Sequence, residues 1–322
     1  MRFIFDFTII FILSFSGYWM YLIIRSFFYD KKNNIRTKLI RIFLLIILLL
    51  IFITIFYGSF IEPQRIKINP VEINLAQTSE KENIKIVFLT DLHVGAYKQS
   101  DFVEKVVKLT NEQYPDLILL GGDYILGDEE NAKFLNPLKN LNNNYSGKIF
   151  AVTGNHEFNA EGYNSPKIKD KTKLLRQIFA DSGIKMLDNE NQFLDIGGNK
   201  IFLAGISDLW SNSADLQTAQ KISAGQELPL TKILLSHNPD IILDPQSENF
   251  NLIISGHTHA GQIRLPFIGS VPEIPDQLGR AFDHGLFKLK NGFLYASAGL
   301  GESGTRARLF NPPELTVINL DL

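Results

Sequence analysis

Two uncharged apolar stretches dominate the first sixty residues of the chain. Residues 7–24 contain no charged side chain over 18 positions, and residues 42–60 contain none over 19 positions between Arg41 and Glu62. A helix needs about 20 apolar residues to cross the hydrocarbon core of a bilayer, and about 17 suffice. Both stretches therefore predict membrane-spanning helices, which together make a transmembrane hairpin of residues 1–62.

The first stretch carries the weaker signal, because Ser14, Ser16 and Gly17 dilute it. A signal peptide is the alternative, but its amino end has little positive charge beyond Arg2 and no small-x-small cleavage site follows it. We therefore favour a retained membrane helix. For the second stretch the alternative is a buried helix of a soluble protein, and its length argues against that.

Basic residues gather in the short loop between the two stretches. They are Arg25, Lys31, Lys32, Arg36, Lys38 and Arg41, with Asp30 as the opposing charge. The flank after the second stretch has only Arg65 and Lys67. The positive-inside rule therefore places the loop in the cytoplasm and predicts a multi-pass protein of the cytoplasmic (inner) membrane, with the large remainder extracytoplasmic. Contact of the loop with anionic lipid head groups is compatible with this topology.

From about Gln64 the pattern changes to shorter apolar runs. Residues 66–75 roughly alternate between apolar and polar, which predicts a strand, and Pro70 restricts that strand to an edge. Apolar runs predict buried strands at 84–89, 116–120 and 148–152. Helical spacing predicts helices over 102–109, with Ser100 or Asp101 as the N-cap, and over 171–181. Later strands are expected at 192–196, 200–204, 232–235, 251–254, 261–265, 285–289, 292–296 and 315–320.

This order of elements predicts the fold class of residues 63–322. Strands that alternate with helices and are followed by many strands indicate two sheets packed together with helices outside, in the α/β (α+β) class. Ligands of such sheets gather at the carboxyl ends of the strands. Side chains that directly follow the predicted strands are therefore the first candidates for a functional site.

Composition narrows the chemistry. The formal net charge of −2 gives no reason to expect a nucleic-acid partner. The chain has no cysteine, which excludes thiol nucleophiles, disulfides and Cys-ligated zinc. It has six histidines, and five of them lie in short motifs at the ends of apolar runs. The motifs are Asp91-Leu92-His93, Gly122-Asp123, Gly154-Asn155-His156-Glu157, Ser236-His237-Asn238 and Gly256-His257-Thr258-His259.

The residue types in these motifs indicate a two-metal phosphoesterase. Asp, His and Asn without sulfur suit hard or borderline divalent metals. On an extended chain Asp91 and His93, two positions apart, project to the same side. Asp123 has two carboxylate oxygens with which to bridge two cations. Two metals about 3.5–4 Å apart activate a water and clamp both oxygens of a phosphoryl displacement. His156, beside a metal ligand, is placed to stabilise the leaving oxygen or to give it a proton.

Asp91-x-His93 and Gly122-Asp123 alone arise often by chance, whereas Gly154-Asn155-His156-Glu157 is moderately specific and Gly256-His257-Thr258-His259 is strong. The ordered set resembles the calcineurin-like metallophosphoesterase superfamily. That family has the pattern D-x-H, G-D, G-N-H-[E/D], H and G-H-x-H, and the similarity spans roughly residues 84–322. The resemblance implies a four-layer αββα sandwich of two mixed sheets flanked by helices. It also implies two divalent metal ions, Mn, Fe or Zn, with His156 as the catalytic residue. Matched positions assign one metal to Asp91, His93, Asp123 and His259, and the other to Asp123, Asn155, His237 and His257.

A narrower similarity lies in residues 256–268 and 299–321. These segments resemble a membrane-tethered bacterial branch of the family, which includes hydrolases of UDP-2,3-diacylglucosamine in lipid A synthesis. The chain departs from that branch at Ala298, where an Arg is expected. Candidate ligands for substrate phosphate are Arg264, Arg306 and Arg308, with salt bridges to surface carboxylates as the alternative. His284 fits no motif and is interpreted as an ordinary surface or loop histidine.

The main hypothesis is a membrane-anchored dimetal hydrolase of phosphodiester or pyrophosphate bonds in a lipid-linked substrate. UDP-2,3-diacylglucosamine is the specific substrate that the resemblance adds. A role in lipid A synthesis requires a cytoplasmic domain, in conflict with the positive-inside rule. Phosphomonoesters or cyclic nucleotides are alternative substrates. A non-catalytic membrane binding module is a further alternative, which the loss of a ligand would favour, and no ligand of the pattern is missing.

Overall fold

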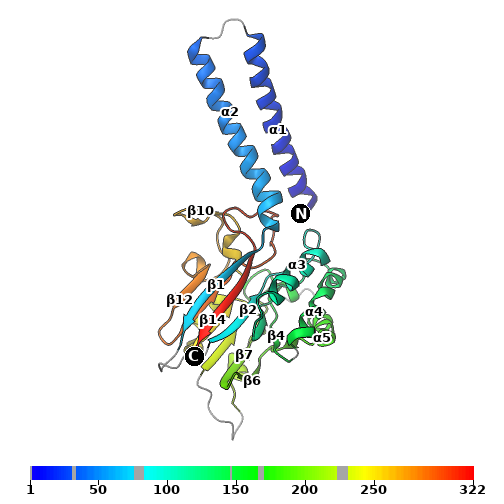
Figure 1. The fold of residues 1–322 in the computed structure, drawn as a ribbon, viewed down its shortest axis with the longest axis vertical. Coiled ribbons are helices and arrows are strands. Elements are labelled where there is room, and N and C mark those ends of the chain that lie inside the picture. The colour runs from blue at the N-terminus through cyan, green and yellow to red at the C-terminus, as the bar shows by residue number, and fades with distance from the viewer. Residues whose placement is uncertain (1, 31–33, 76–82, 146, 166–169, 223–230) are drawn as a thin grey trace.

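Two long helices project from one end of a domain built of strands and shorter helices (Figure 1). The structure is a computed structural model, and it describes residues 2–30, 34–75, 83–145, 147–165, 170–222 and 231–322. Helix α1 spans Arg2–Tyr29 and helix α2 spans Ile35–Phe56. Both are long and apolar enough to cross a membrane, judged by length and composition. They run antiparallel beside each other, with most of their apolar side chains exposed.

Hydrogen bonds join the end of α2 to the domain, and residues 57–64, which follow the helix, are called its exit below. The helix continues into a π-helical turn, Tyr57–Ile61, and a 3₁₀ turn, Glu62–Gln64. The carboxylate of Glu62 accepts hydrogen bonds from the backbone N–H groups of Phe310 (3.0 Å) and Asn311 (2.6 Å). Arg308 donates its backbone N–H to the carbonyl of Gly58 at 2.9 Å. The base of α2 therefore has a defined position against the C-terminal part of the chain.

The described residues of the first large sheet form six strands in the order β1-β14-β2-β3-β4-β5. They are β1 Lys67–Asn74, β2 Asn83–Leu89, β3 Leu117–Leu120, β4 Ile149–Ala151, β5 Lys185–Met186 and β14 Glu314–Asp321. β1 is an edge strand, as Pro70 predicts, and it runs away from α2 in parallel with β14. β2 is antiparallel to β14, and β3 and β4 are parallel to β2. The carboxyl ends of β2, β3 and β4 therefore face the end of the domain that carries α1 and α2.

The second large sheet also has six strands within the described residues, in the order β12-β13-β9-β8-β7-β6. They are β6 Glu190–Ile196, β7 Asn199–Gly205, β8 Thr231–Leu235, β9 Leu252–Ser255, β12 Gly285–Lys288 and β13 Phe293–Ala296. β7, β8, β9 and β13 are parallel, and the two edge strands are antiparallel to their neighbours. Apolar side chains from both sheets, Phe88 and Leu119 against Leu235 and Ile254 among them, form the core between them.

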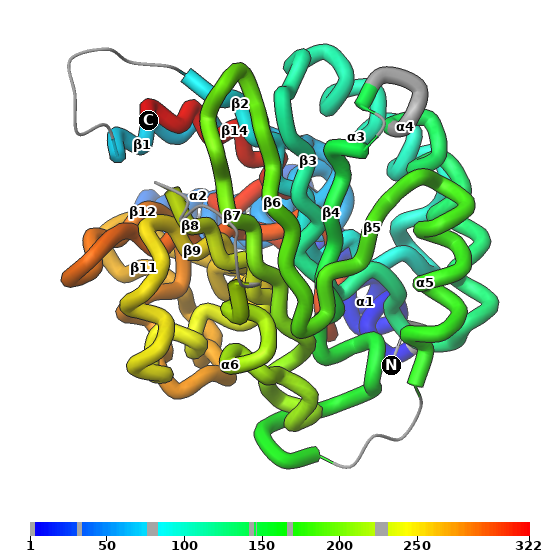
Figure 2. The backbone as a smooth tube through the Cα atoms, turned by 90° about the horizontal axis from the view of Figure 1, so that it is seen from below, coloured from blue at the N-terminus to red at the C-terminus, as the bar shows by residue number. Residues whose placement is uncertain are grey.

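Helices cover the outer face of each sheet. The first sheet is covered by α3 Ser100–Asn111, the 3₁₀ segment Glu129–Leu138, α4 Lys139–Tyr145 and α5 Thr172–Asp181. The second is covered by α6 Leu216–Ala219 and the 3₁₀ turns Pro239–Leu243 and Pro245–Asn249. Figure 2 shows α3, α4 and α5 on one side of β3 and β4, with β8 and β9 on the other. Two mixed sheets flanked by helices confirm the predicted fold class.

Two local predictions were wrong. Residues 261–265 do not form one strand, because Ala260 (φ 50°) and Gln262 (φ 58°) adopt left-handed conformations that interrupt an extended chain. Instead a 3₁₀ turn, His259–Gly261, precedes the two-residue strand β10, Arg264–Leu265, which pairs with β11, Gly269–Ser270. The N-cap of α3 is Gln99 rather than Ser100 or Asp101, and its side chain makes no capping hydrogen bond. A further 3₁₀ turn spans Gly279–Phe282.

Candidate active site

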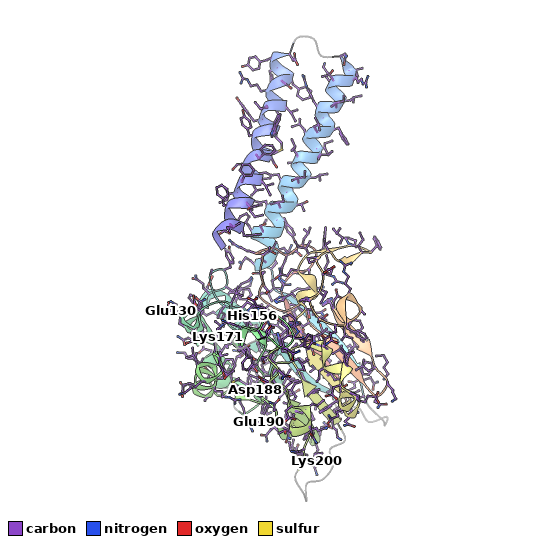
Figure 3. The ribbon with its side chains drawn as sticks, turned by 180° about the vertical axis from the view of Figure 1, so that it is seen from behind. Glu130, His156, Lys171, Asp188, Glu190 and Lys200 are labelled. Carbon is purple, nitrogen blue, oxygen red and sulfur yellow. The ribbon has the colours of Figure 1, made fainter. Side chains whose placement is uncertain are left out.

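The motif residues converge at the carboxyl ends of strands from both sheets. Asp91 and His93 follow β2, Asp123 follows β3, and the 3₁₀ turn Asn155–Glu157 follows β4. From the second sheet, His237 follows β8, and His257 and His259 follow β9. Figure 3 shows His156 closer to the two long helices than Lys200, which lies at the far end of the domain. The site therefore lies on the side of the domain that α1 and α2 occupy.

Several of these residues adopt left-handed backbone conformations. Positive φ angles occur at Asp91 (55°), His93 (45°), Asp123 (55°), His257 (70°) and His259 (49°). Such conformations are uncommon for residues other than glycine and concentrate at functional sites. They also correct one step of the sequence argument. Asp91 and His93 do not meet by alternation along an extended chain, because the turn at each residue aims its side chain at the site.

A first group of ligand atoms gathers around Asp91, His93 and His259. Their ligand atoms lie within 4.8 Å of one another. The Nε2 atoms of His93 and His259 are 3.1 Å apart, and Oδ1 of Asp91 is 3.5 Å from Nε2 of His259. Oδ2 of Asp123 is 3.5 Å from Nε2 of His93. Four side chains thus direct oxygen or nitrogen atoms at one point.

A second group gathers on the other side of Asp123. Its Oδ2 atom is 3.2 Å from Nε2 of His237. Oδ1 of Asn155 is 3.3 Å from that nitrogen and 3.1 Å from Nδ1 of His257. The two histidine nitrogens are themselves 3.2 Å apart. Asp123 therefore belongs to both groups, and the same carboxylate oxygen faces each of them.

The site has too few protons for all of these nitrogen and oxygen atoms to pair by hydrogen bonds. Burial lowers the pKa of His93 and His259 and lowers that of His257 to about 3, so these rings are neutral and offer lone pairs. Burial opposes charge on His237 too, but the carboxylate of Asp123 outweighs it and raises the pKa of His237 to about 10. The cluster therefore demands positive charge. Its buried O and N donor set fits divalent metal ions.

Hydrogen bonds to the backbone orient the side chains and turns that carry the ligand atoms. His237 donates its Nδ1–H to the carbonyl of Gly121 at 2.7 Å, which leaves Nε2 as the ligand atom. The buried carboxylate of Glu157 accepts the backbone N–H groups of Asp123 (2.9 Å), Tyr124 (3.0 Å) and Gly154 (2.8 Å). Glu157 thereby joins the turn after β3 to the turn after β4. Sequence reasoning noted it within its motif without assigning this role.

Glycines permit the close approach of neighbouring segments. A Cβ atom on Gly154 would lie 2.3 Å from Oδ1 of Asp123, and one on Gly256 would lie 2.4 Å from Oδ2 of Asp91. Any larger residue would push a carboxylate out of position. The glycine that precedes each of these motifs is therefore required by packing around the ligands.

His156 lies at the edge of the cluster. Its Nε2 atom is 3.9 Å from Oδ2 of Asp123, and its side chain is 27% exposed. The backbone holds it on both sides, because its N–H donates to Oδ1 of Asp123 at 2.9 Å and its carbonyl accepts from Nζ of Lys171 at 2.9 Å. Its ring therefore faces both the ligand cluster and the cleft, where it is able to exchange a proton with a bound substrate.

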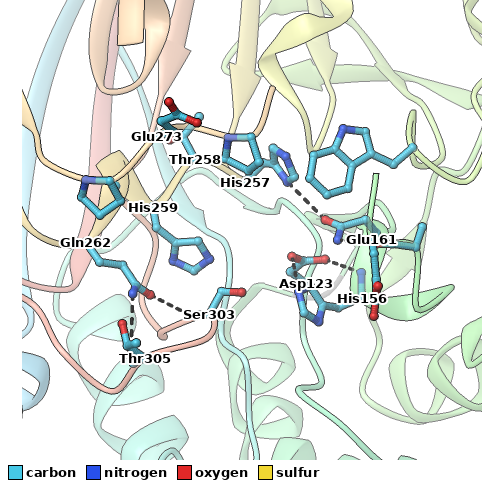
Figure 4. Close-up of a pocket in the computed structure, with 16 residues that line it drawn as sticks. Asp123, His156, Glu161, His257, Thr258, His259, Gln262, Glu273, Ser303 and Thr305 are labelled. Atoms are coloured by element: carbon cyan, nitrogen blue, oxygen red, sulfur yellow. Dashed lines mark hydrogen bonds and ion pairs between the residues drawn. The ribbon is translucent and has the colours of Figure 1, made fainter. Parts of the chain in front are cut away.

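A cleft of about 430 Å³ opens over the ligands (Figure 4). Its wall includes Trp210, whose ring meets that of His257 edge-on with centroids 4.4 Å apart. Gln262 accepts the N–H of Ser303 (2.7 Å) and donates to the carbonyl of Thr305 (3.2 Å), and all three line the cleft. Sequence reasoning missed Trp210 and Gln262, since neither stands in a metal motif. Only the position of Gln262, three residues after His259, offered a signal.

The three arginines proposed for phosphate binding lie elsewhere, and the described residues that line the cleft include none of them. Arg308 is fully buried, and its guanidinium donates to the carbonyls of Ala298, Gly299, Gly301 and Asn311. Arg264 forms a salt bridge at 2.6 Å with Asp283, which is buried rather than one of the surface carboxylates expected as the alternative. The guanidinium of Arg306 lies over the rings of Phe60 and Tyr97.

Two further expectations concern the same region. His284 lies in the loop before β12, as expected of a loop histidine, but its Nε2 atom is 2.8 Å from the carboxylate of Glu314 and its side chain is half-buried. The position at which an Arg was expected holds Ala298, which is buried, and Nη2 of Arg308 bonds its carbonyl at 2.9 Å. Arg308 therefore occupies the turn from a different point of the chain.

Comparison with known proteins agrees with this geometry. The family described as calcineurin-like phosphoesterase matches residues 84–261. An uncharacterized metallophosphoesterase of Campylobacter jejuni is 34% identical, covering 90% of this chain and 72% of its own length. The uncharacterized metallophosphoesterase YkuE of Bacillus subtilis is 30% identical over 82% of this chain and 88% of its own. Phosphodiesterase YaeI of Escherichia coli is 31% identical over 73% of this chain and 82% of its own.

Proposed function

This chain belongs to the calcineurin-like phosphoesterase family, and we propose that it is a membrane-anchored hydrolase of phosphodiester or pyrophosphate bonds in a lipid-linked substrate. Its family makes it a metal-dependent phosphoester hydrolase that uses two divalent metal ions. The observation that carries the proposal is the pair of ligand groups sharing Asp123 at the end of the domain nearest α1 and α2.

The proposed ligand sets follow the two groups. One ion is held by Asp91, His93, Asp123 and His259, and the other by Asp123, Asn155, His237 and His257. When bound, the two ions activate a water molecule and neutralise charge on the phosphoryl group. His156, at the edge of the cluster, donates a proton to the leaving oxygen. Mn, Fe and Zn all suit these ligands, and metal analysis of the purified protein identifies the ion.

The lipid-linked substrate is proposed from the position of the site. Residues 1–62 act as a two-helix membrane anchor and residues 63–322 as the catalytic domain. Because the ligand-bearing strand ends face the anchor, a substrate embedded in the same bilayer lies close to them. UDP-2,3-diacylglucosamine is the specific candidate that the sequence resemblance supplies. The name of phosphodiesterase YaeI supports a diester over a monoester.

Hydrolysis by the purified full-length protein in detergent with Mn²⁺ tests this function. We expect bis-p-nitrophenyl phosphate to be cleaved faster than p-nitrophenyl phosphate, and UDP-2,3-diacylglucosamine in mixed micelles to be cleaved at its pyrophosphate. Asp123→Asn removes the oxygen charge shared by both groups and should abolish all of these activities while the circular dichroism spectrum is retained. Dominant cleavage of the monoester would overturn the diester or pyrophosphate preference, and dominant cleavage of cyclic nucleotides, which are also diesters, would overturn the lipid-linked substrate.

The side of the membrane is tested separately. The basic loop predicts an extracytoplasmic domain, so an alkaline phosphatase fusion after Leu322 should be active and a cytoplasmic reporter at the same position inactive. The reverse result would overturn the extracytoplasmic placement and favour a substrate made in the cytoplasm, such as UDP-2,3-diacylglucosamine. An active periplasmic fusion would instead direct the search to lipid-linked pyrophosphates of the outer leaflet.

A further inference from the structure

A small hairpin beside the cleft exposes a continuous apolar tip. β10 and β11 pair Arg264 with Ser270, and the sequence between them begins Leu-Pro-Phe-Ile. Phe267 is fully exposed, at 108%, and Ile268 is 64% exposed. Leu265 and Val271 are exposed as well, at 39% and 47%. Contiguous exposed apolar side chains on this scale mark an interaction site. Residues 264–271 are called the apolar hairpin below.

The apolar hairpin lies next to the exit of α2. Arg264 donates its backbone N–H to the carbonyl of Leu309 at 2.9 Å, and Leu309 donates to the carbonyl of Gln262 at 3.1 Å. The residue before Leu309 is Arg308, whose N–H bonds Gly58 in the turn that ends α2. One short segment therefore touches both the apolar hairpin and the helix exit. Figure 1 shows β10 level with the lower end of α2.

The helix exit has the side chains typical of a lipid–water boundary. The guanidinium of Arg306 lies 5.2 Å from the ring centroid of Phe60 and 4.6 Å from that of Tyr97. The hydroxyl of Tyr57 accepts a hydrogen bond from Arg65 at 3.1 Å. Aromatic rings and cations with apolar stems concentrate where hydrocarbon meets water. This set indicates where the membrane surface meets the protein.

Exposed apolar side chains continue from the helix exit toward the hairpin. Ile61, at the end of the turn after α2, is 40% exposed, and Phe310 is 62% exposed. The two are held near each other, since the carboxylate of Glu62 binds the backbone of Phe310. Exposed apolar side chains therefore run from the end of α2, where that helix would leave the membrane, over Phe310 to the apolar hairpin.

The apolar hairpin also shares a rim with the cleft. Gly261 and Gln262, which precede it, line the cleft, and so do Pro272 and Glu273, which follow it. A surface that binds the hairpin therefore also lies next to the mouth of the cleft.

We infer that the apolar hairpin inserts its tip into the bilayer that α1 and α2 cross, so that the mouth of the cleft is held at the lipid–water boundary. The inference rests on the membrane anchoring in the proposed function. The bilayer is the occupant that the structure favours, because the apolar surface is continuous with the exit of a helix long and apolar enough to cross one. A partner protein or a second copy would need its own apolar surface at that level.

Fluorescence labelling tests the insertion directly, because the chain has no cysteine and one introduced thiol can be labelled alone. Phe267→Cys carrying the polarity-sensitive dye NBD is reconstituted as the full chain into vesicles of phosphatidylcholine and phosphatidylglycerol. Tyr114→Cys is the matched control. Tyr114 is 81% exposed and lies just before β3, at the opposite end of the sheet from the site.

We expect the label at position 267 to emit at shorter wavelength in vesicles and to be quenched by phosphatidylcholine with a spin label high on its acyl chain. The label at position 114 should show neither effect. Equal emission at the two positions would overturn the inference. A blue shift at 267 without quenching by the spin-labelled lipid would also overturn it, since the tip would then be buried against protein.

A second measurement connects insertion with turnover. Replacing Phe267 by Ser should lower kcat/KM for UDP-2,3-diacylglucosamine in vesicles by about tenfold, the order expected from removing the burial of one large apolar side chain. Hydrolysis of soluble bis-p-nitrophenyl phosphate should stay unchanged, and Tyr114→Ser should change neither rate. An equal loss on both substrates would overturn the inference.

The outcomes separate the inference from the function. If no hydrolysis sensitive to Asp123→Asn is found while the label at 267 inserts, the proposed function fails and the insertion stands. If the hydrolysis is present and the label stays in water, the function stands and the insertion fails.

Discussion

Two buried polar clusters lie close together in this domain, and they are built on opposite principles. In the cleft, lone pairs of the neutral rings of His93 and His259 and the carboxylates of Asp91 and Asp123 face one another without enough protons to join them. Behind it, Glu302 lies 3.3 Å from Nζ of Lys98 and 3.6 Å from Nε of Arg308. The second cluster contains its own countercharges, and backbone carbonyls accept its remaining donors.

The difference separates a binding site from a cluster that holds chain segments together, which is called the fastening below and consists of Lys98, Glu302 and Arg308. A buried cluster with surplus acceptors needs a cation from outside, whereas a cluster that contains its own ion pairs holds chain segments together. Arg308 joins the turn at Gly299 and Gly301 to Asn311, and Asn311 in turn donates to the carbonyl of His259 at 2.7 Å. The fastening therefore supports the site without entering it. The following variants are chosen to break this distinction.

The largest effect is expected in the cleft, from His156→Ala. General acid catalysis contributes about 10²–10⁴-fold, so kcat for a diester with an alkyl leaving group should fall by that factor. The loss should be smaller for bis-p-nitrophenyl phosphate, because p-nitrophenolate leaves without a proton. Steady-state rates on both substrates, with metal content measured in parallel, check this. Equal losses on the two substrates at full metal content would contradict a proton-donor role.

In the fastening, Arg308→Met should act on stability rather than on substrate binding. Removing one partner of a buried ion pair costs about 3–5 kcal/mol, because Glu302 and several carbonyls lose their partner. Arg264→Met is the matched control. Its side chain is 23% exposed and pairs with the buried Asp283 and one backbone carbonyl, so it should cost less than Arg308→Met, about 1–3 kcal/mol. Urea denaturation in detergent measures both free energies of unfolding.

The same two variants decide the question of phosphate binding. If neither arginine touches substrate, KM for bis-p-nitrophenyl phosphate stays within about twofold of wild type wherever the protein remains folded. A large rise of KM in Arg308→Met with unchanged stability would place this guanidinium in the site after all.

The comparison also explains what the sequence allows one to predict. The ligand atoms of Asp91, His93, Asp123, His237 and His257 are brought together as their motifs suggest, because a motif at a strand end carries its own position in the fold. The arginines carry no such position. Whether Arg308 meets a phosphate or four carbonyls depends on residues 298–311 folding around it, which no local pattern records.

Local conformation divides in the same way, into what a run of residues determines by itself and what tertiary contacts determine. Long apolar runs, such as residues 84–89, predict their strands well, since burial on both faces leaves a strong pattern. The left-handed turns at Asp91 and His259 were not predicted, because tertiary contacts rather than local preference hold them. The two-residue strand β5 and the four-residue helix α6 are too short to show any periodicity.

A smaller effect is expected at Glu157, which holds the turns that carry the ligands without lining the cleft itself. Burial, followed by the charge of Asp123, raises the pKa of Glu157 to about 8, while three backbone N–H groups hold its carboxylate. Glu157→Gln turns an amide NH₂ toward those donors and should lower metal affinity by about 10–100-fold.

Activity titrated against free Mn²⁺ measures this affinity. The kcat at saturating metal should approach that of wild type, because Glu157 positions the turns without touching substrate. Glu161→Gln, an exposed residue on the rim of the cleft, is the control and should leave the titration unchanged. A loss of kcat that metal does not restore would argue for a direct catalytic role of Glu157.

The smallest effect concerns the ion pair between His284, just before β12, and Glu314, at the start of β14, and it depends on pH. Burial alone would raise the pKa of Glu314, but hydrogen bonds from His284, Tyr295 and Thr316 outweigh burial and hold it at about 2. The usual value is 4.5, so the carboxylate contributes stability that is fully present above about pH 4.5 and is lost as the pH falls toward 2. The free energy of unfolding of wild type minus that of Glu314→Gln should therefore shrink as the pH falls below about 4.5. Urea denaturation at each pH measures it, and a difference that grows on acidification would show that the carboxylate is not stabilised in the folded state.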